Sequence, residues 1–221
     1  MKENLKKNLR LLIITSIVVL LPLIVGLALW SRLPAELPTH FNAYGVADRY
    51  DSRAFTVIGL PLMLLSIHLF CVLLSMKDFD KAGSKMVHVV FWLIPVLTVL
   101  TMSGIYAKAF NVDINMGFIV ILSISLITII MGNYLPKIKQ NTTIGIRIPS
   151  TFRSEENWYR THRFTGKLWV ITGIIMIVVS FTKINLGYAA LTWLGIDILA
   201  PIIYSLSISK KTEEKYDGKE E

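Results

Sequence analysis

Residues 117–166 read GFIVILSISLITIIMGNYLPKIKQNTTIGIRIPSTFRSEENWYRTHRFTG. The stretch from Gly117 to Leu135 carries no charged side chain, and it is long enough for a helix to cross the roughly 30 Å of hydrocarbon in a bilayer. From Pro136 onward the chain becomes basic and rich in turn residues, so it cannot be a membrane span. We name residues 132–166 the signature segment, and we expect this segment and a shorter loop near the N-terminus to carry the function.

Apolar blocks of similar length recur along the chain. Hydrophobic residues make up 53% of the 221 residues and charged residues 17%, a balance unusual for a soluble protein. The sequence therefore predicts an all-α integral membrane protein, a bundle of six transmembrane helices with an outer loop and an inner amphipathic helix. The expected spans are Leu11–Trp30, Ala54–Met76, Val87–Ile105, Gly117–Leu135, Leu168–Phe181 and Gly187–Ile208.

The distribution of positive charge predicts the orientation. With the N-terminus inside, 18 of the 23 Lys and Arg residues fall on the inner side of the spans, as the positive-inside rule requires. Both termini and the segment between the fourth and fifth spans are then cytoplasmic, in a multi-pass protein of the cytoplasmic membrane. The net charge of +8 is a topology signal, and no direct binding of nucleic acid is expected.

The chain divides into four parts by this topology. Residues 1–53 hold the first span and the long outer loop, and residues 54–131 hold spans two to four. Residues 132–166 are the inner signature segment, and residues 167–221 form a helical hairpin of spans five and six with an inner tail.

Local signals predict how the signature segment folds. Gly145 permits a positive φ or a close backbone approach, and Pro149 pushes the residue before it out of the helical region. A helix is expected to start near Ser154 and to run into the fifth span. Trp158 and His162 are four residues apart and share one face of that helix, with Trp158 expected at the membrane interface.

These residues resemble the signature of the SdpI family, bacterial membrane proteins that confer immunity to a secreted peptide toxin. The resemblance implies a bacterial immunity protein that binds lipid bilayer and toxin, and that also holds a transcriptional repressor at the membrane. Ser150 stands where the family often carries an aromatic residue. The residues expected to meet a partner in this inner segment are Asn133, Pro136, Asn141, Gly145, Arg147, Pro149, Trp158, His162 and Arg163.

The outer loop is similar to a short domain that often precedes this signature. Its matching residues are Pro38, His40, Asn42, Gly45 and Asp48. A metal site on His40 is the less favoured interpretation, because zinc sites usually need three or four ligands. A hydrogen bond that organises the loop is the favoured one, and no metal or other cofactor is expected.

Two further alternatives remain open on the sequence. Arg147, His162 and Arg163 suit an anionic group or an acidic partner, but a basic loop that only sets topology explains them nearly as well. His68 and Asp197 fall near the middle of their spans, where ionisable groups usually face a partner inside the bundle. A buried His68–Asp197 pair would favour a small ion-coupled transporter, although an interhelical contact is the simpler interpretation. No nucleophile–base motif is present, so no enzyme is expected.

Overall fold

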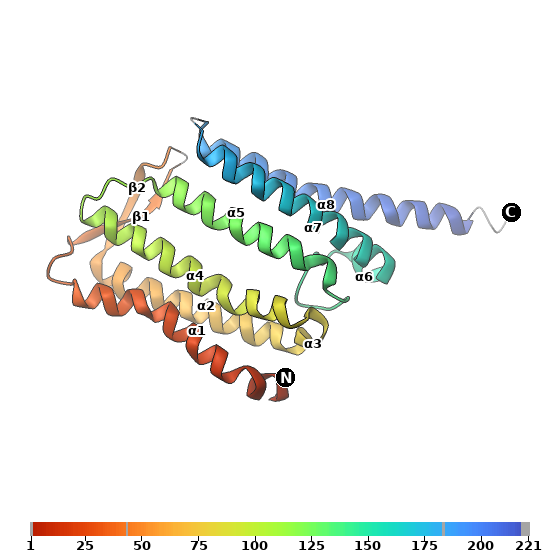
Figure 1. Ribbon diagram of the computed structural model, residues 1–221, viewed down its shortest axis with the longest axis horizontal. Coiled ribbons are helices and arrows are strands. Elements are labelled where there is room, and N and C mark those ends of the chain that lie inside the picture. Colours follow the sequence, from red (N-terminus) through yellow and green to blue (C-terminus); the bar gives the residue numbers. More distant parts are fainter. Residues whose placement is uncertain (1, 43, 183, 218–221) are drawn as a thin grey trace.

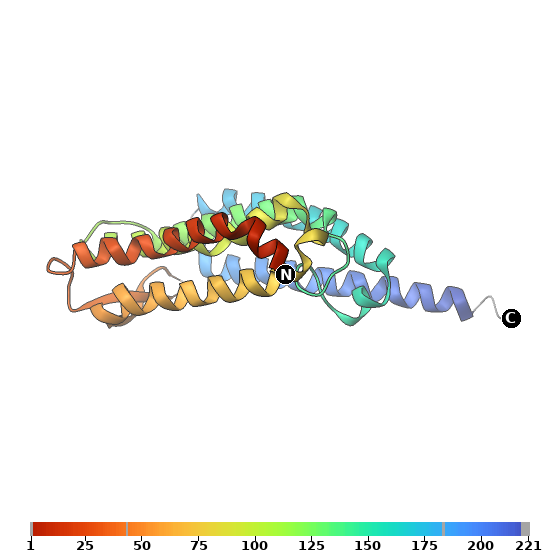
Figure 2. The same ribbon diagram turned by 90° about the horizontal axis from the view of Figure 1, so that it is seen from below.

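The computed structural model describes residues 2–42, 44–182 and 184–217. Its long helices lie roughly along one axis (Figure 1). They are α1 (Lys2–Ala28), α2 (Leu60–Ser75), α4 (Ser84–Ala109), α5 (Met116–Tyr134), α7 (Glu155–Ser180) and α8 (Leu186–Asp217). Seen at right angles, the bundle is shallow, and α8 extends beyond the other helices at one end (Figure 2).

The helices form two groups that meet along one seam. Helices α1, α2 and α4 pack together, as do α5, α7 and α8, and α4 lies beside α5 (Figure 1). Short elements connect them: α3 (Phe79–Ala82) precedes α4, and α6 (Pro149–Arg153) precedes α7. The seam between α4 and α5 is therefore where the two halves of the chain join.

Within the described residues, six helices are long and apolar enough to cross a membrane. Only 17% to 33% of the residues in their most apolar windows are buried inside the protein, so most apolar side chains on these helices point outward. Phe70, Val178 and Leu191, for example, are each more than 60% exposed. Such a surface requires lipid around it. The prediction of an all-α membrane protein with six spans is confirmed.

The structure adds a small sheet that the sequence did not suggest. Strand β1 (Glu36–Phe41) pairs antiparallel with β2 (Ala47–Ser52), so the expected outer loop is a β-hairpin. The register is irregular at His40, where Pro38 pairs with Tyr50 and His40 pairs with Arg49. Short polar strands without alternating hydrophobicity give little signal, which is why the sequence indicated only a loop.

Helix α7 is continuous from Glu155 to Ser180, so the inner amphipathic helix runs into the fifth span, as expected. The helix able to span a membrane therefore begins well before Leu168, where the expected span began. Ser154 caps it by accepting from the backbone N–H of Asn157 at 3.3 Å, as the sequence indicated. The Trp158 side chain is only 2% exposed, so it packs inside the protein and does not face lipid; its depth relative to the membrane interface stays a prediction.

Several segments that are far apart in the chain lie at the same end of the bundle. One end of the bundle holds the start of α1, the short helices α3 and α6, the end of α8 and residues 135–154 (Figure 1). We call it the signature end. The opposite end carries β1, β2 and the loop Phe110–Asn115, and we call it the hairpin end. Residues 218–221 of the expected inner tail lie outside the described residues, and the four-part division of the chain stays a prediction.

Helices α5 and α7 approach each other closely at two glycines. A Cβ placed on Gly166 would lie 2.6 Å from the carbonyl oxygen of Gly132 and 2.7 Å from Cγ of Pro136. A Cβ on Gly132 would lie 2.8 Å from the carbonyl oxygen of Gly166. Small residues that let backbones touch are a common way to pack helices in membranes, where burial of apolar surface contributes little.

We expect Gly166→Ala to lower the melting temperature of the detergent-solubilised protein by several degrees. The added methyl group meets backbone rather than a mobile side chain, and such overpacking costs about 1–3 kcal/mol. Gly195→Ala is the matched control, because a Cβ on Gly195 meets nothing within 4 Å. Equal melting temperatures for the two variants would contradict the close contact.

Orientation is tested by accessibility to an impermeant thiol reagent, in a background where the single cysteine, Cys71, is replaced by Ser. Tyr44→Cys probes the exposed turn at the hairpin end, and Lys139→Cys probes the exposed surface of the signature end. From the charge bias we expect the cysteine at position 44 to react in intact cells and the one at position 139 to react only after permeabilisation. The reverse pattern would overturn the predicted topology.

Candidate functional site

A buried amide shapes the first part of the signature segment. Asn141 is 3% exposed, and its side-chain NH₂ donates to the carbonyls of Lys139 and Ile144, both at 2.9 Å. Its Oδ1 accepts from the backbone N–H of Thr143 at 2.9 Å and of Ile144 at 2.7 Å. All four hydrogen-bonding positions of the amide are therefore used within the segment. Asn141 is a structural centre of the loop, and its side chain is not available to a partner.

An aspartate from the other half of the bundle holds the same loop. Oδ2 of the buried Asp78 accepts from the backbone N–H of Thr142 at 3.1 Å and from both threonine hydroxyls, of Thr142 and Thr143, at 2.9 Å. The backbone N–H of Lys139 also donates to the carbonyl of Lys81 at 3.0 Å. The sequence did not point to Asp78, because it is one of two aspartates, with Asp80, in a short charged loop and no motif distinguishes it.

Trp158 and His162 lock the second part of the segment to α7. Their rings stack with centroids 4.1 Å apart, and the indole N–H of Trp158 donates to the carbonyl of Ile138 at 2.8 Å. Nε2 of His162 accepts from the backbone N–H of Ile146 at 3.0 Å, so the ring proton sits on Nδ1 and is donated to the Trp158 carbonyl at 2.8 Å. Both ring nitrogens are occupied, and the side chain of His162 is fully buried.

Gly145 lies against this histidine. Its φ is +119°, in the region that the sequence analysis reserved for glycine, and a Cβ there would collide with Nε2 of His162. The two residues therefore require each other: glycine leaves room for the imidazole, and the imidazole accepts the N–H of the next residue.

The remaining signature residues lie at or near the surface. Arg147 is exposed and donates through Nη1 to the carbonyl of Thr142 at 2.8 Å, and Arg163 is exposed and lies 3.3 Å from the hydroxyl of Tyr159. Asn133 is exposed, and Pro149 begins α6. Pro136 packs near Gly166, as described above. Only the exposed members of the set can meet a partner, and that role stays a prediction.

Ser150, which departs from the family pattern, has a defined contact here. It is 4% exposed, and its hydroxyl lies 2.7 Å from the hydroxyl of Ser205 in α8. Asn157 joins the same group, because its amide donates to the Ser205 carbonyl at 3.0 Å and accepts from the Ser205 hydroxyl at 2.8 Å. This polar cluster ties the signature segment to α8.

The hairpin residues organise their own turn. Nδ1 of His40 and Oδ1 of Asp48 are 2.6 Å apart, and Oδ1 of Asn42 accepts from the backbone N–H groups of Tyr44 at 2.9 Å and of Val46 at 3.1 Å. Gly45 has a φ of +74°, while Pro38 in β1 is buried. The loop-organising interpretation is what the geometry shows. Across the described chain, no group of three or more His, Cys, Asp or Glu residues is placed to hold a metal ion.

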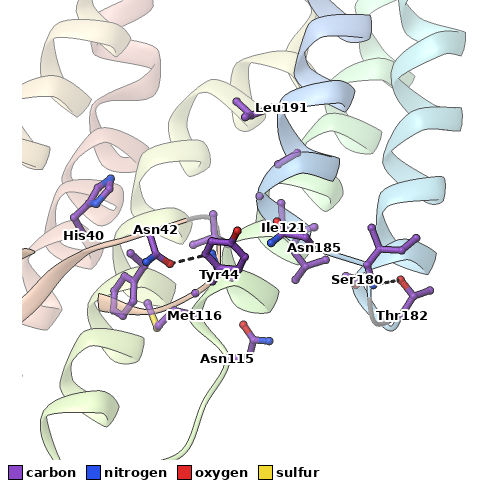
Figure 3. Close-up of a pocket in the computed structure, with 18 residues that line it drawn as sticks. His40, Asn42, Tyr44, Asn115, Met116, Ile121, Ser180, Thr182, Asn185 and Leu191 are labelled. Carbon is purple, nitrogen blue, oxygen red and sulfur yellow. Dashed lines mark hydrogen bonds between the residues drawn. The ribbon is translucent and has the colours of Figure 1, made fainter. Parts of the chain in front are cut away.

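A pocket of about 640 Å³ lies beside this turn (Figure 3). Three segments far apart in sequence line it: the hairpin with His40 and Tyr44, the start of α5 with Met116, and the connection from α7 to α8 with Thr182. Its lining mixes apolar and polar side chains. The labelled polar and aromatic ones are His40, Asn42, Tyr44, Asn115, Ser180, Thr182 and Asn185.

The sequence pointed to the hairpin residues as candidates, but it did not point to the residues on the other two sides of this pocket. Asn115 and Asn185 each precede a helix and accept from a backbone N–H in its first turn, at 3.1 Å in both cases. An asparagine directly before an apolar run is a helix-capping signal, so the helix starts could have been found. Their proximity to the hairpin could not.

The predicted His68–Asp197 pair is wrong. His68 in α2 is fully buried, and its Nε2 lies 3.0 Å from the hydroxyl of Thr15 in α1. Asp197 in α8 accepts from the hydroxyl of Thr172 in α7 at 2.8 Å. Each residue bonds to a neighbour within its own group of helices, because α2 and α8 belong to different halves of the bundle. Buried polar groups take the nearest partner that satisfies them.

We expect His162→Phe to lower the melting temperature of the detergent-solubilised protein by several degrees. The phenyl ring keeps the stack on Trp158 but leaves the Ile146 N–H without its acceptor, at a cost of about 1–3 kcal/mol. Limited proteolysis should then cut residues 142–148 faster. Arg163→Ala is the control, because that side chain is exposed and adjacent in sequence. A His162→Phe protein as stable and as resistant to protease as the control would contradict the assigned role.

Comparison with known proteins agrees with the geometry at both ends. Residues 137–205 match the sequence model described as the SdpI/YfhL protein family, and residues 17–65 match a domain of unknown function, DUF1648. The second match spans the hairpin, while the first begins after Asn133 and Pro136. No solved structure matches the chain.

A relative whose name states a function is also found. The chain is 28% identical over 202 residues to the protein named Immunity protein SdpI from Bacillus subtilis (strain 168). The aligned region covers 91% of this chain and 94% of that protein. The likeness therefore includes both the hairpin and the signature segment, in the same order. The resemblance drawn from the sequence is confirmed: this membrane protein matches the SdpI/YfhL family model after a DUF1648 match, and most of the chain is similar to Immunity protein SdpI.

Proposed function

We propose that this protein gives the bacterium that carries it resistance to a secreted, membrane-active peptide. The observation that carries the proposal is the likeness, over nine-tenths of the chain, to a protein named for immunity. Six helices able to span a membrane, together with the likeness to a bacterial protein, support a location in the bacterial cell membrane, where such a peptide acts. The role is one of binding rather than catalysis.

The pocket at the hairpin end is the place we propose for contact with the peptide. Its lining includes the apolar side chains of Met116, Ile121 and Leu191 as well as Asn and Thr side chains. Peptides that act on membranes are amphipathic, and a pocket of this kind offers partners to both of their faces. With the orientation expected from the charge bias, the pocket opens to the outside of the cell.

A second step belongs to the same proposal: the signature end holds a transcriptional repressor at the membrane when the peptide is bound. In its favour, Lys139, Arg147 and Arg163 are exposed there, and their charges suit an acidic protein surface. Membrane recovery of a repressor encoded beside the gene would test this step. Peptide-dependent recovery that Arg147→Ala and Arg163→Ala do not reduce would contradict it.

The transporter alternative loses its main support. It depended on a buried His68–Asp197 pair, and the two side chains are bonded instead to Thr15 and Thr172. Both contacts join neighbouring helices, so the simpler interpretation of each residue, an interhelical hydrogen bond, accounts for it.

The peptide contact is tested with two tyrosines of the same hairpin. Tyr44 is 71% exposed and lines the pocket, whereas Tyr50 is 54% exposed and lies outside it. We expect Tyr44→Ala, expressed in a sensitive strain, to lower the highest peptide concentration that the cells survive by about tenfold or more. Aromatic side chains in a binding contact often contribute about 2 kcal/mol or more to the binding free energy.

Tyr50→Ala is expected to protect as well as the unmodified protein, with equal amounts of each variant in the membrane. Full protection by Tyr44→Ala would remove the pocket from the proposal. Failure of the unmodified protein to protect against secreted peptides of related strains would contradict the immunity function itself.

A further inference from the structure

A second hollow lies on the seam between α4 and α5, far from the pocket at the hairpin end. It has a volume of about 480 Å³, and its walls are apolar side chains of the two helices. Helix α4 contributes Trp92 and Val96 to the lining, and α5 contributes Ile127 and Ile130. At the signature end it terminates at Lys85, His88 and Tyr134. We call it the seam groove.

The length of the seam groove corresponds to one leaflet of a bilayer. From Lys85 to Val96 the helix rises about 16 Å, at about 1.5 Å per residue. Half of the hydrocarbon thickness is about 15 Å. The groove therefore runs from the polar boundary, where α4 begins, to about the middle of the membrane, which is the course of a phospholipid acyl chain.

Two lysines lie near Tyr134 at the polar end of the groove: Lys85 lines the groove, whereas Lys137 lies outside its lining and contacts the same tyrosine ring. Nζ of Lys85 lies 5.9 Å from the centroid of the Tyr134 ring, and Nζ of Lys137 lies 4.9 Å from the same centroid. Among the side chains that the structure describes, no carboxylate lies within ion-pair distance of either ammonium group. Ammonium groups that lie near one tyrosine and have no carboxylate partner favour the binding of an anion nearby.

We propose that the seam groove binds an anionic glycerophospholipid. One acyl chain lies between α4 and α5, and the phosphate group meets Lys85, Lys137 and the hydroxyl of Tyr134. A peptide fits less well, because the apolar walls offer few partners to backbone N–H and C=O groups in a membrane. The lipid joins the two halves of the bundle at their seam. This proposal does not depend on immunity, and its test does not use it.

The test measures the melting temperature of the delipidated protein in detergent, with dioleoyl phosphatidylglycerol or dioleoyl phosphatidylcholine added. At a lipid concentration about a hundredfold above the dissociation constant, we expect phosphatidylglycerol to raise the melting temperature by about 5–10 °C and phosphatidylcholine to raise it much less. Native mass spectrometry should show one phosphatidylglycerol retained per chain. Equal effects of the two lipids would overturn the proposal.

Paired variants separate charge from shape. Lys85→Ala with Lys137→Ala should abolish the preference for phosphatidylglycerol, whereas Lys6→Ala with Lys7→Ala removes the same charge from exposed positions of α1 and should keep it. Ile130→Trp fills the groove and should weaken binding of phosphatidylglycerol. Leu126→Trp lies one turn away on α5, at a similarly exposed position outside the groove, and should not.

Three other results would contradict the proposal. Retention of the lipid preference in the double Lys85/Lys137 variant would show that these charges do not hold the phosphate. Equal binding by Ile130→Trp and Leu126→Trp would show that no acyl chain lies in the groove. A full shift produced by glycerol phosphate alone would assign the two lysines to a free anion instead of a lipid.

Discussion

The backbone contact between Gly132 and Gly166 is the constraint on which the second half of this protein depends. It brings α5 and α7 close enough for the segment between them to fold back over the helix ends. Trp158 then reaches the carbonyl of Ile138, and His162 reaches the N–H of Ile146. In a membrane, where apolar burial contributes little between helices, such contacts and their hydrogen bonds set the geometry.

The signature segment is therefore a built structure rather than a basic linker. The polar side-chain atoms of its buried residues Asn141, Trp158 and His162 form hydrogen bonds within the segment itself. Asp78 contributes from the other half of the bundle and couples α3 to the loop. The exposed arginines sit on this rigid base, so a partner would meet charges held in fixed positions.

The two ends of the bundle have different chemistry. The hairpin end carries a pocket lined by apolar side chains together with amides and hydroxyls, while the signature end carries exposed lysines and arginines over a polar scaffold. The two halves of the bundle meet at the seam between α4 and α5, and a groove follows this seam from the signature end.

The sequence by itself determined the six spans, the ordered segment after the fourth, the cap at Ser154 and the positive φ at Gly145. Each of these depends on residues that are close in the chain, through apolar length, capping or backbone sterics. The resemblance to a family was also recognisable, because its motif residues lie within one segment of the chain, residues 132–166.

Only the tertiary structure decided which polar groups meet. His68 and Asp197 have similar depth and chemistry in the sequence, yet they bond to Thr15 and Thr172. Asp78, Asn115 and Asn185 acquired their roles from segments that lie distant in the chain. Periodicity shows which face of a helix is apolar or polar, but not which helix packs against that face. Hydrogen bonds and pockets between helices depend on that packing.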